Sequence, residues 1–438
     1  MKNYRNLVPV ALILLMVVSI YTIISDAATK KKEVDEKITQ AENCISQELY
    51  DKAASIYDEV ISIDNQLSYY LKVIDMYFSA GDLYSSEDWC ENALDAYPKS
   101  AEIYERLINI YITDEEYEDA FITLDECSGK KVNSETIEKY RKKIEFTHFY
   151  KNKTFDYVAQ SSSGYVAVKK KEKWGLANTS GSLVVSPRFD DIGYFANGMV
   201  PVLINGVWYM MNESGEYVYN LTKSIDGKIT DIGLYNNDVI PICVNGVYSY
   251  YDLNFKKKFG EYDFAGSFSS GVAAVKDGES WFLIDTSGKL ITEVAYENVI
   301  LDDRGICCQK ERIFAKVNNQ YILLDAKGNK VNNNNFDDAK LFTNGDYAAV
   351  EIDGLWGFVD TNGEVVISPI YFDAKSFSLG LASVTTDGEL WGYIDASGNE
   401  IIEDEYIFCY TFTNEGSAFV QEDENDWKIL KLYKYNYN

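Results

Sequence analysis

The last two thirds of the chain alternate apolar and polar positions with a period of two, which is typical of β-strands with one packed face. The clearest case lies at residues 355–367, where Trp356 and Phe358 alternate with Gly357 and Val359. A Thr-Asn-Gly turn and an apolar return strand follow, and both Asn and Gly tolerate the positive φ of a tight hairpin. The pattern predicts a β-hairpin centred on the tryptophan.

Diverged copies of this hairpin recur down the chain. In seven copies an Asp or Asn lies four residues after an aromatic anchor, and in six copies a Gly lies seven residues after it. The anchors return every 33 to 40 residues, at Trp174, Trp208, Tyr248, Trp281, Tyr321, Trp356, Trp391 and Trp427. One unit is three or four short strands, which cannot bury both faces alone. The copies are therefore expected to stack against one another.

These residues resemble the WG-repeat family of bacterial proteins over residues 155–430. The namesake dipeptide occurs at Trp174-Gly175, Trp356-Gly357 and Trp391-Gly392. Other copies depart from it, because Tyr209 or Phe282 takes the place of the glycine. The resemblance implies a β-repeat domain and carries no common activity.

The units number seven plus a partial eighth between residues 151 and 438. Repeats of this size close most naturally into a ring of blades, because a ring protects strand edges. We therefore predict an all-β, β-propeller-like domain, with an open β-solenoid as the alternative. The aromatic anchors are expected to pack between blades rather than to form a ligand cage.

Residues 30–150 show a helical period instead, with apolar residues at spacings of three and four. Small and aromatic positions recur 34 residues apart, as Tyr70, Val73, Tyr77 and Ala93 and then as Tyr104, Leu107, Tyr111 and Cys127. This spacing resembles tetratricopeptide repeats and predicts an α-solenoid of about three helix pairs. A basic capping helix is expected from Ser134 to about Phe149, and residues 151–163 are expected to form a hinge into the β domain.

The N-terminal segment 1–29 contains an uncharged apolar run from Leu7 to Ser25. A helix of this length spans ~28 Å, about one bilayer core, and exceeds a secretory signal core. We therefore predict a transmembrane helix that anchors the protein in the cell membrane in a single pass. Flanking charges do not fix its orientation, and the short leading tail favours a bulk that lies outside the cytoplasm.

Charge and cysteine content exclude some classes of partner and some kinds of site. The formal net charge of −28 argues against nucleic acid and against anionic membrane surfaces. Its simplest role is solubility of a large β surface. The seven cysteines, an odd number at scattered spacings, form no disulfide or zinc framework. The adjacent pair Cys307 and Cys308 is interpreted as packing rather than as a redox site.

No catalytic, cofactor-binding or metal-binding residue is predicted. The single histidine, His148, has no nucleophile motif to serve, and no Walker or dinucleotide loop occurs. The segments that begin at Asp285 and Asp360 superficially resemble calcium loops but fall where hairpins turn. Three carboxylate pairs could in principle host glycosidase chemistry, namely Asp190 and Asp191, Asp302 and Asp303, and Asp337 and Asp338.

The sequence thus predicts a membrane-anchored, non-enzymatic binding or scaffold protein. A protein or peptide partner is expected in the groove of the helical array and on the β-repeat surface. A carbohydrate or cell-wall glycan ligand is the alternative, since tyrosine is abundant. A glycosidase-like enzyme is the third hypothesis, and it rests only on the carboxylate pairs.

Overall fold

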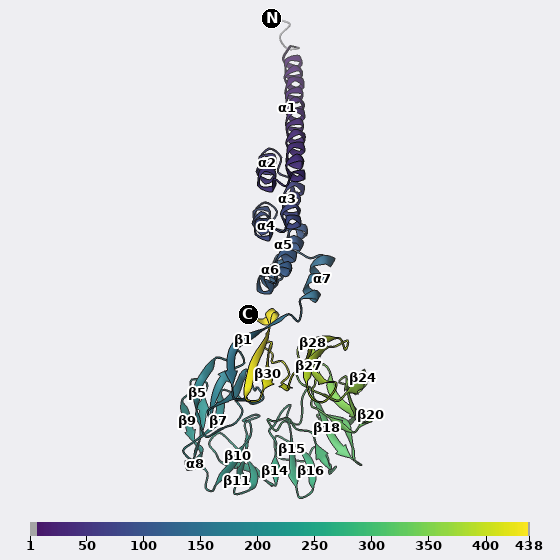
Figure 1. The fold of residues 1–438 in the computed structure, drawn as a ribbon. Helices are drawn as coiled ribbons and strands as arrows, with labels where there is room; N and C mark the ends of the chain where they lie inside the picture. Colours follow the sequence, from purple (N-terminus) through teal and green to yellow (C-terminus); the bar gives the residue numbers. More distant parts are fainter. Residues whose placement is uncertain (1–6, 437–438) are drawn as a thin grey trace. The chain divides into compact units, whose positions relative to one another are not determined.

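The computed structural model describes residues 7–436, and their side chains apart from residues 7–15, 17–18, 20–24 and 152. The chain divides into two compact units, one that ends at Thr147 and one from His148 to Asn436. The first unit is helical and the second is built from β-strands (Figure 1).

The helical unit is an array of consecutive, mutually packed helices. The helices α3 and α5 start 34 residues apart, as do α4 and α6, so the predicted period is present. The array supports the predicted helical repeat at this coarser level. Its elements are α1 (Leu7–Ser46), α2 (Tyr50–Ile63), α3 (Leu67–Ala80), α4 (Leu83–Ala96), α5 (Ala101–Thr113), α6 (Tyr117–Lys130) and α7 (Glu135–Lys143).

Small and aromatic residues hold the helices of the array together. Ala53 and Ala93 are completely buried, which lets neighbouring helices approach closely. The repeated tyrosines reach acidic side chains on the preceding helix, since Tyr77 Oη donates to Asp51 at 3.1 Å and Tyr111 Oη to Glu87 at 2.7 Å. Each repeat is thereby linked to the one before it by a charge-assisted hydrogen bond.

The structure contradicts the predicted transmembrane helix. The apolar run is only the first part of α1, a single 40-residue helix. From Asp26 onward α1 carries many charged residues, and its later turns pack into the array, with Val34 and Ala41 buried. Within the described part of the chain no helix is long and apolar enough to span a membrane, and most side chains of residues 7–24 lie outside that part. The membrane anchor is therefore not retained.

The β unit of the described chain is an eight-bladed β-propeller. Each sheet is one blade, and the blades are numbered along the chain from β2. Seven blades have four strands, and blade 4 has three. All neighbouring strands within a blade are antiparallel, and consecutive blades follow one another around the ring (Figure 1). The closed ring confirms the predicted propeller and excludes the open solenoid for this unit.

The strands of the first four blades follow in chain order. Blade 1 contains β2 (Tyr157–Val158), β3 (Tyr165–Lys170), β4 (Lys173–Asn178) and β5 (Leu183–Phe189). Blade 2 contains β6 (Asp191–Ile192), β7 (Met199–Ile204), β8 (Val207–Asn212) and β9 (Tyr217–Asn220), followed by the short helix α8 (Leu221–Ser224). Blade 3 contains β10 (Ile229–Ile232), β11 (Ile240–Val244), β12 (Val247–Tyr251) and β13 (Lys257–Tyr262). Blade 4 contains β14 (Phe264–Ala265), β15 (Val272–Asp277) and β16 (Ser280–Asp285).

The second half of the ring repeats this order. Blade 5 contains β17 (Asn298–Val299), β18 (Arg312–Val317), β19 (Gln320–Asp325) and β20 (Lys330–Phe336). Blade 6 contains β21 (Asp338–Ala339), β22 (Ala348–Ile352), β23 (Leu355–Val359) and β24 (Val365–Tyr371). Blade 7 contains β25 (Asp373–Ala374), β26 (Leu381–Thr385), β27 (Trp391–Asp395) and β28 (Glu400–Tyr406). Blade 8 contains β29 (Phe408–Cys409), β30 (Ser417–Asp423), β31 (Asp426–Leu432) and β1 (His148–Phe155), and the turn η1 (Tyr433–Tyr435) follows.

Blade 8 closes the ring by combining both ends of the unit. The strand β1 pairs antiparallel with β31, with His148 opposite Leu432 and Phe155 opposite Trp427. This pairing corrects the boundary predicted from sequence, because α7 ends at Lys143 and residues 148–155 are a strand rather than a helix end and a hinge. The partner strand lies at the other end of the unit, so no local pattern could have revealed it.

The predicted hairpin turns are confirmed. Gly363 has φ +75°, and Asp360 Oδ1 accepts hydrogen bonds from the backbone N–H of Asn362 and of Glu364, both at 2.9 Å. The acids or amides four residues after the other anchors make the same pair of bonds in six further blades, at Asn178, Asn212, Asp252, Asp285, Asp325 and Asp395. These carboxylate and amide side chains therefore serve the turns, as the turn interpretation expected.

Replacing a turn acid should show this role directly. Hydrogen bonds from Ser287 Oγ and then from the Lys289 backbone hold the pKa of Asp285 below its usual value. A depressed folded pKa means that the contribution to stability is present above the unfolded pKa, about 3.9, and is lost as pH falls through the folded pKa. We expect Asp285→Ala to lower the free energy of unfolding by about 1 kcal/mol at pH 7.

The matched control is Asp285→Asn, because Asn178 and Asn212 fill the same turn position. We expect this variant to cost less than Asp285→Ala at pH 7, and its stability to change less with pH than that of the wild type. Urea unfolding at several pH values between 2.5 and 7 is the measurement. Equal costs for Ala and Asn would show that the turn does not depend on the acceptor oxygen.

Candidate functional site

The first strands of the blades face the axis of the ring. The residues directly after the first strands of four different blades line one common pocket at the axis, namely Ile300, Lys340, Lys375 and Tyr410. The side chains at this position therefore decide how much of the channel is filled.

The residue that immediately follows the first strand changes size halfway around the ring. It is small in blades 1 to 4 and large in blades 5 to 8: Ala159, Gly193, Gly233 and Gly266, and then Ile300, Lys340, Lys375 and Tyr410. The two halves of the channel are consequently filled in different ways.

In blades 6 and 7 a lysine covers the tryptophan of its own blade. Lys340 Nζ lies 4.6 Å from the ring centre of Trp356, and Lys375 Nζ lies 5.1 Å from that of Trp391. Both indoles are buried, with exposures of 6% and 8%. Such contacts are attractive because the indole face carries negative charge density.

Lys375 is enclosed more fully than Lys340. Its Nζ donates a 2.6 Å hydrogen bond to the carbonyl oxygen of Cys409 and lies 3.2 Å from the ring centre of Phe408. Burial lowers the pKa of Lys375 to about 8. In blade 8 the equivalent residue, Tyr410, stacks on Trp427 with ring centres 5.5 Å apart. The anchors of blades 6 to 8 are thus covered by residues of the chain itself.

The other half of the channel is filled by a loop. Residues 300–311 between β17 and β18 form a twelve-residue connection, whereas the corresponding connections in the other blades have six to eight residues. Ser267 in blade 4 donates its backbone N–H to Gly305 at 2.8 Å and its Oγ to the carbonyl oxygen of Arg304 at 2.9 Å. Ile306 packs in an apolar cluster with Ala196 and Leu234 from blades 2 and 3.

The glycine that follows the first strand of blade 4 makes room for this loop. A Cβ added to Gly266 would lie 2.6 Å from the carbonyl oxygen of Gly305, so only glycine permits the approach. Within the loop, Asp302 Oδ1 accepts the backbone N–H groups of Arg304 and Ile306, and its Oδ2 binds the Arg304 guanidinium. The loop is therefore held both by itself and by blade 4.

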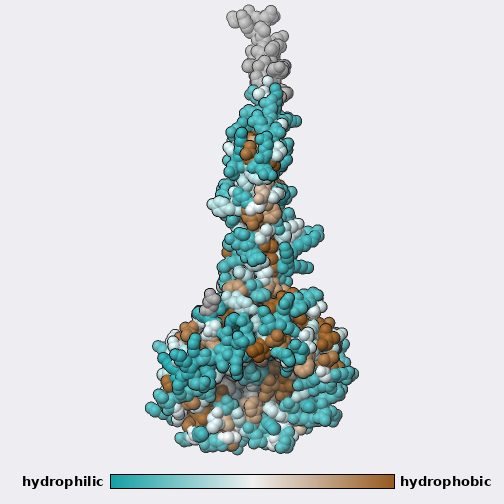
Figure 2. All heavy atoms as spheres, in the orientation of Figure 1, coloured by the Kyte–Doolittle hydropathy of each residue, from teal (hydrophilic) through white to brown (hydrophobic). Residues whose placement is uncertain are grey.

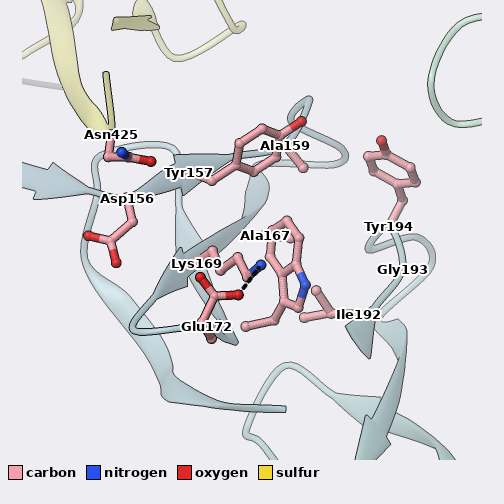
Figure 3. A pocket seen from close by; sticks show the side chains of 11 residues that line it. Asp156, Tyr157, Ala159, Ala167, Lys169, Glu172, Ile192, Gly193, Tyr194 and Asn425 are labelled. Carbon is pink, nitrogen blue, oxygen red and sulfur yellow. Dashed lines mark ion pairs between the residues drawn. The ribbon is translucent and has the colours of Figure 1, made fainter. Parts of the chain in front are cut away.

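In blade 1 the space beside the tryptophan is lined neither by a lysine that follows the first strand nor by this loop, and it is a pocket of about 470 Å³ (Figure 3). Trp174 is half-buried, in contrast to Trp356 and Trp391. The ring of Tyr157 stands edge-on to the indole, with centres 5.6 Å apart. The lining residues are Asp156, Tyr157, Ala159, Ala167, Lys169, Glu172, Trp174, Ile192, Gly193, Tyr194 and Asn425.

Charged groups border this pocket. Lys169 Nζ forms an ion pair with Glu172 at 3.1 Å, drawn as the dashed line in Figure 3, and lies 5.8 Å from the Trp174 ring centre. Asp156 Oδ2 accepts the backbone N–H of Lys171 at 2.7 Å. Burial, followed by the charges of Asp303 and Asp302, raises the pKa of the Tyr194 hydroxyl. The environment of the pocket is therefore aromatic with a negative potential.

Two of the three carboxylate pairs serve the backbone. Asp190 Oδ2 accepts the N–H of Asn205 at 2.7 Å, and Asp337 Oδ2 accepts that of Asp353 at 2.8 Å. Their partners Asp191 and Asp338 each accept the N–H of the next residue. These groups secure turns between neighbouring strands.

The third pair, Asp302 and Asp303, lies in the channel loop. Burial and then the charge of Asp302 raise the pKa of the Asp303 carboxyl. The first acid is used by Arg304 and the loop backbone, so the two carboxylates have different roles.

The remaining residues of interest are structural in their surroundings. His148 begins the closing strand β1. All seven cysteines are buried free thiols, and burial raises the pKa of Cys308 to about 11, which agrees with the packing interpretation. Among the residues that the structure describes, no group of three or more His, Cys, Asp or Glu side chains could hold a metal ion.

In the sequence Trp174 stands out only as a repeat anchor, and the pocket beside it was not predicted. The signal was present at the position fifteen or sixteen residues before the anchors, where Ala159 stands in the place of Lys340 and Lys375. Aligning the copies on their first strands, rather than on the anchors alone, would have exposed this difference.

Comparison with known proteins supports the repeat and no specific activity. Five stretches match the WG containing repeat family, at residues 174–208, 248–281, 324–356, 356–389 and 391–425. No curated protein matches the chain.

Similarity to solved structures is weak. Hsv2p of Kluyveromyces lactis is 10% identical, with 56% of this chain and 93% of that chain covered and a TM-score of 0.37. BamB from Moraxella catarrhalis is 12% identical, with 65% and 96% covered and a TM-score of 0.39. Virginiamycin B lyase from Staphylococcus aureus is 13% identical, with 55% and 94% covered and a TM-score of 0.33. Similarities at this level carry no functional argument.

Proposed function

We propose that this chain is a non-enzymatic binding protein that engages a protein partner through its propeller. The observation that carries the proposal is the pocket beside Trp174, an aromatic anchor that the chain leaves half-buried while it covers Trp356 and Trp391. Concave, aromatic-lined pockets with a few polar groups are the usual form of binding sites. The carboxylates considered for catalysis are largely engaged in turns, which supports binding over hydrolysis.

The helical array supplies a second surface for the same role. Its elongated stack of helices is suited to a peptide or a partner helix. Ion pairs between successive repeats, Glu42 with Lys72 and Asp75 with Arg106, are satisfied within the array. On the face shown in Figure 2 the array is mainly hydrophilic and the propeller carries scattered apolar patches. These patches favour the propeller as the principal binding unit.

The test is affinity capture with the full-length chain and two variants. The wild-type chain is used to capture proteins from a lysate of the source cells. We expect the amount of captured protein to fall at least tenfold with Trp174→Ala, because an aromatic hot spot carries much of the binding energy. The matched control is Phe372→Ala, which removes an aromatic side chain that is 61% exposed on another blade. Recovery that is equal for all three chains, or nothing above background, would contradict the proposal.

A carbohydrate ligand is the second candidate. The same pocket offers the face of Trp174 and the polar groups of Asp156, Glu172 and Asn425, a combination that also suits a sugar ring. This role presupposes that the propeller lies outside the cytoplasm, which protease treatment of intact cells would test. Retention on a glycan array or on sedimented peptidoglycan, lost with Trp174→Ala, would favour this candidate over the first.

A further inference from the structure

We infer that the Trp174 pocket binds the aliphatic ammonium group of a lysine side chain from a partner protein. This inference rests on the proposed binding function and names the chemical group that the pocket recognises. Its basis is an internal comparison among the blades of the same ring.

The comparison begins with the lysines of blades 6 and 7. Lys340 and Lys375 directly follow the first strands β21 and β25 and bring their ammonium groups within 4.6 and 5.1 Å of the tryptophan of their blade. In blade 1 the residue that directly follows β2 is Ala159, and the volume beside Trp174 is a pocket. The ring thus contains two blades in which a lysine directly after the first strand lies at the tryptophan, and one blade in which that position is an alanine and only Lys169 of β3 approaches the indole, at 5.8 Å.

The acid that accompanies the lysine is also present. In blade 6, Lys340 Nζ lies 3.9 Å from Asp373, the first residue of the next blade's first strand. The equivalent residue beside blade 1 is Asp191, the first residue of β6. The registers correspond, since Asp191 lies opposite Leu203 and Asp373 lies opposite Thr385.

Among the described residues, Asp191 has no lysine or arginine partner of the kind that Asp373 has in Lys340. Among the described residues it forms no ion pair, and its Oδ1 accepts only the backbone N–H of Ile192, at 2.9 Å. Burial raises the pKa of its carboxyl, as expected for an acid whose charge is incompletely compensated. By the correspondence with Lys340 and Asp373, we expect an ammonium group over Trp174 to lie near this carboxylate, which borders the pocket at the lining residue Ile192.

The wider electrostatics also favour a cation over an anion. Lys169, the cation nearest to the indole, is paired with Glu172, while Asp156 and the channel acids add negative charge around the pocket. The chain as a whole carries a net charge of −28. A basic partner is therefore attracted over long range and then held by the cation–π contact.

The test uses ¹⁹F NMR of the full-length chain labelled with 5-fluorotryptophan. The chain contains seven tryptophans, and Trp174→Phe identifies the resonance of interest. The probes are n-butylammonium, the peptide acetyl-Gly-Lys-Gly-amide, neutral 1-butanol and methyl N-acetylglucosaminide. We expect the Trp174 resonance to move saturably with both amines, at least fivefold more tightly than with 1-butanol.

Two variants make the test specific to the site. Ala159→Lys introduces the side chain found in blades 6 and 7 and should weaken the response to both amines at least fivefold. Lys340→Ala removes the native cover of Trp356 and should add a second resonance that moves with the amines. Retained binding in Ala159→Lys, with the chain folded by circular dichroism, would contradict the assigned position.

The probes separate the possible ligands. No shift with either amine, or an equal shift with 1-butanol, would overturn the inference. A response to n-butylammonium without one to the peptide would identify a free amine and overturn the partner lysine. A response to the glucosaminide alone would favour the carbohydrate candidate. Loss of amine binding while protein capture still depends on Trp174 would leave the proposed function intact and remove only this inference.

Discussion

A chain that begins at Asp156 is expected to lose its cooperative fold, whereas a chain that begins at His148 is expected to form the complete propeller. The difference is the strand β1, the outer strand of blade 8. Phe155 at its end is 5% exposed and packs in one cluster with Trp427 and Ile429. Its removal exposes this cluster and leaves the edge of β31 unpaired.

The expected loss is on the order of 5 kcal/mol, from several ladder hydrogen bonds and from the burial of Phe155. A loss of this size is comparable with the whole stability of an ordinary domain. Blade 4 tolerates three strands because residues after β16 still bridge its edge, with Trp281 opposite Tyr296 and Ile284 opposite Leu290. Blade 8 has no such substitute, since its outer strand also joins the two ends of the ring.

Thermal unfolding followed by circular dichroism, together with size-exclusion chromatography, compares the two chains directly. Both chains lack the helical unit, so its absence cannot explain a difference between them. If the chain that begins at Asp156 remained monomeric and melted within a few degrees of the other, the closing strand would contribute little to the fold.

The closing strand also shows what the sequence could not reveal. Seven copies were recognisable because each is a local pattern, with its anchor, its turn acid or amide and, in six of them, a glycine within about ten residues. The eighth looked partial because its outer strand comes from residues 148–155, which local periodicity assigned to a helix end and a hinge. Pairing between the ends of a unit leaves no periodic signal in either segment.

The prediction of a membrane anchor was wrong for a related reason. A hydropathy window treats Leu7 to Ser25 as a separate element, whereas the structure continues the same helix to Ser46 and packs its later turns into the array. The binding pocket was also beyond local analysis. It exists because a loop from blade 5 fills the channel beside blades 2 to 4 and because lysines fill it in blades 6 and 7.

The unequal repeat intervals do have a local origin that could have been exploited. The interval of 40 residues from Trp281 to Tyr321 contains the long channel loop, and that from Trp208 to Tyr248 contains α8. An insertion within a regular array of repeats marks a blade whose structure differs from that of the other blades. The insertion between Trp281 and Tyr321 is the loop that fills part of the channel.

The second large effect is expected for Gly357→Ala, which should lower the free energy of unfolding by about 3 kcal/mol. A Cβ at this position would lie 2.6 Å from the carbonyl oxygen of Ile367 and 2.7 Å from the nitrogen of Pro369. Both atoms belong to the backbone of the outer strand β24, which cannot move aside as a side chain can. Urea unfolding of the full-length chain measures the loss.

The matched control is Gly354→Ala, three residues earlier in the same blade. Gly354 has φ +80° and no heavy atom within 4 Å of an added Cβ, so its replacement costs only the backbone strain, about 1 kcal/mol. A larger loss at position 357 than at 354 separates a steric collision from a conformational preference. Equal losses would show that the outer strand can shift to accept a methyl group.

The same geometry explains why glycine follows tryptophan in this repeat. In blade 6 the pairing passes from Trp356 opposite Tyr371 to Phe358 opposite Ile367, so the outer strand bulges directly over Gly357. A Cβ at Gly175 would lie 2.6 Å from the carbonyl oxygen of Val185, and one at Gly392 would lie 2.4 Å from that of Ile402.

Blade 5 provides the natural contrast. Its residue after the anchor, Ile322, pairs in register with Asn335, so no bulge covers it and a side chain is tolerated. Gly175→Ala and Gly392→Ala should therefore be as costly as Gly357→Ala, whereas Ile322→Gly should lose only the burial and the strand preference of one side chain. Agreement among the three glycine variants would establish the dipeptide as a backbone requirement of the blade, independent of any ligand at its tryptophan.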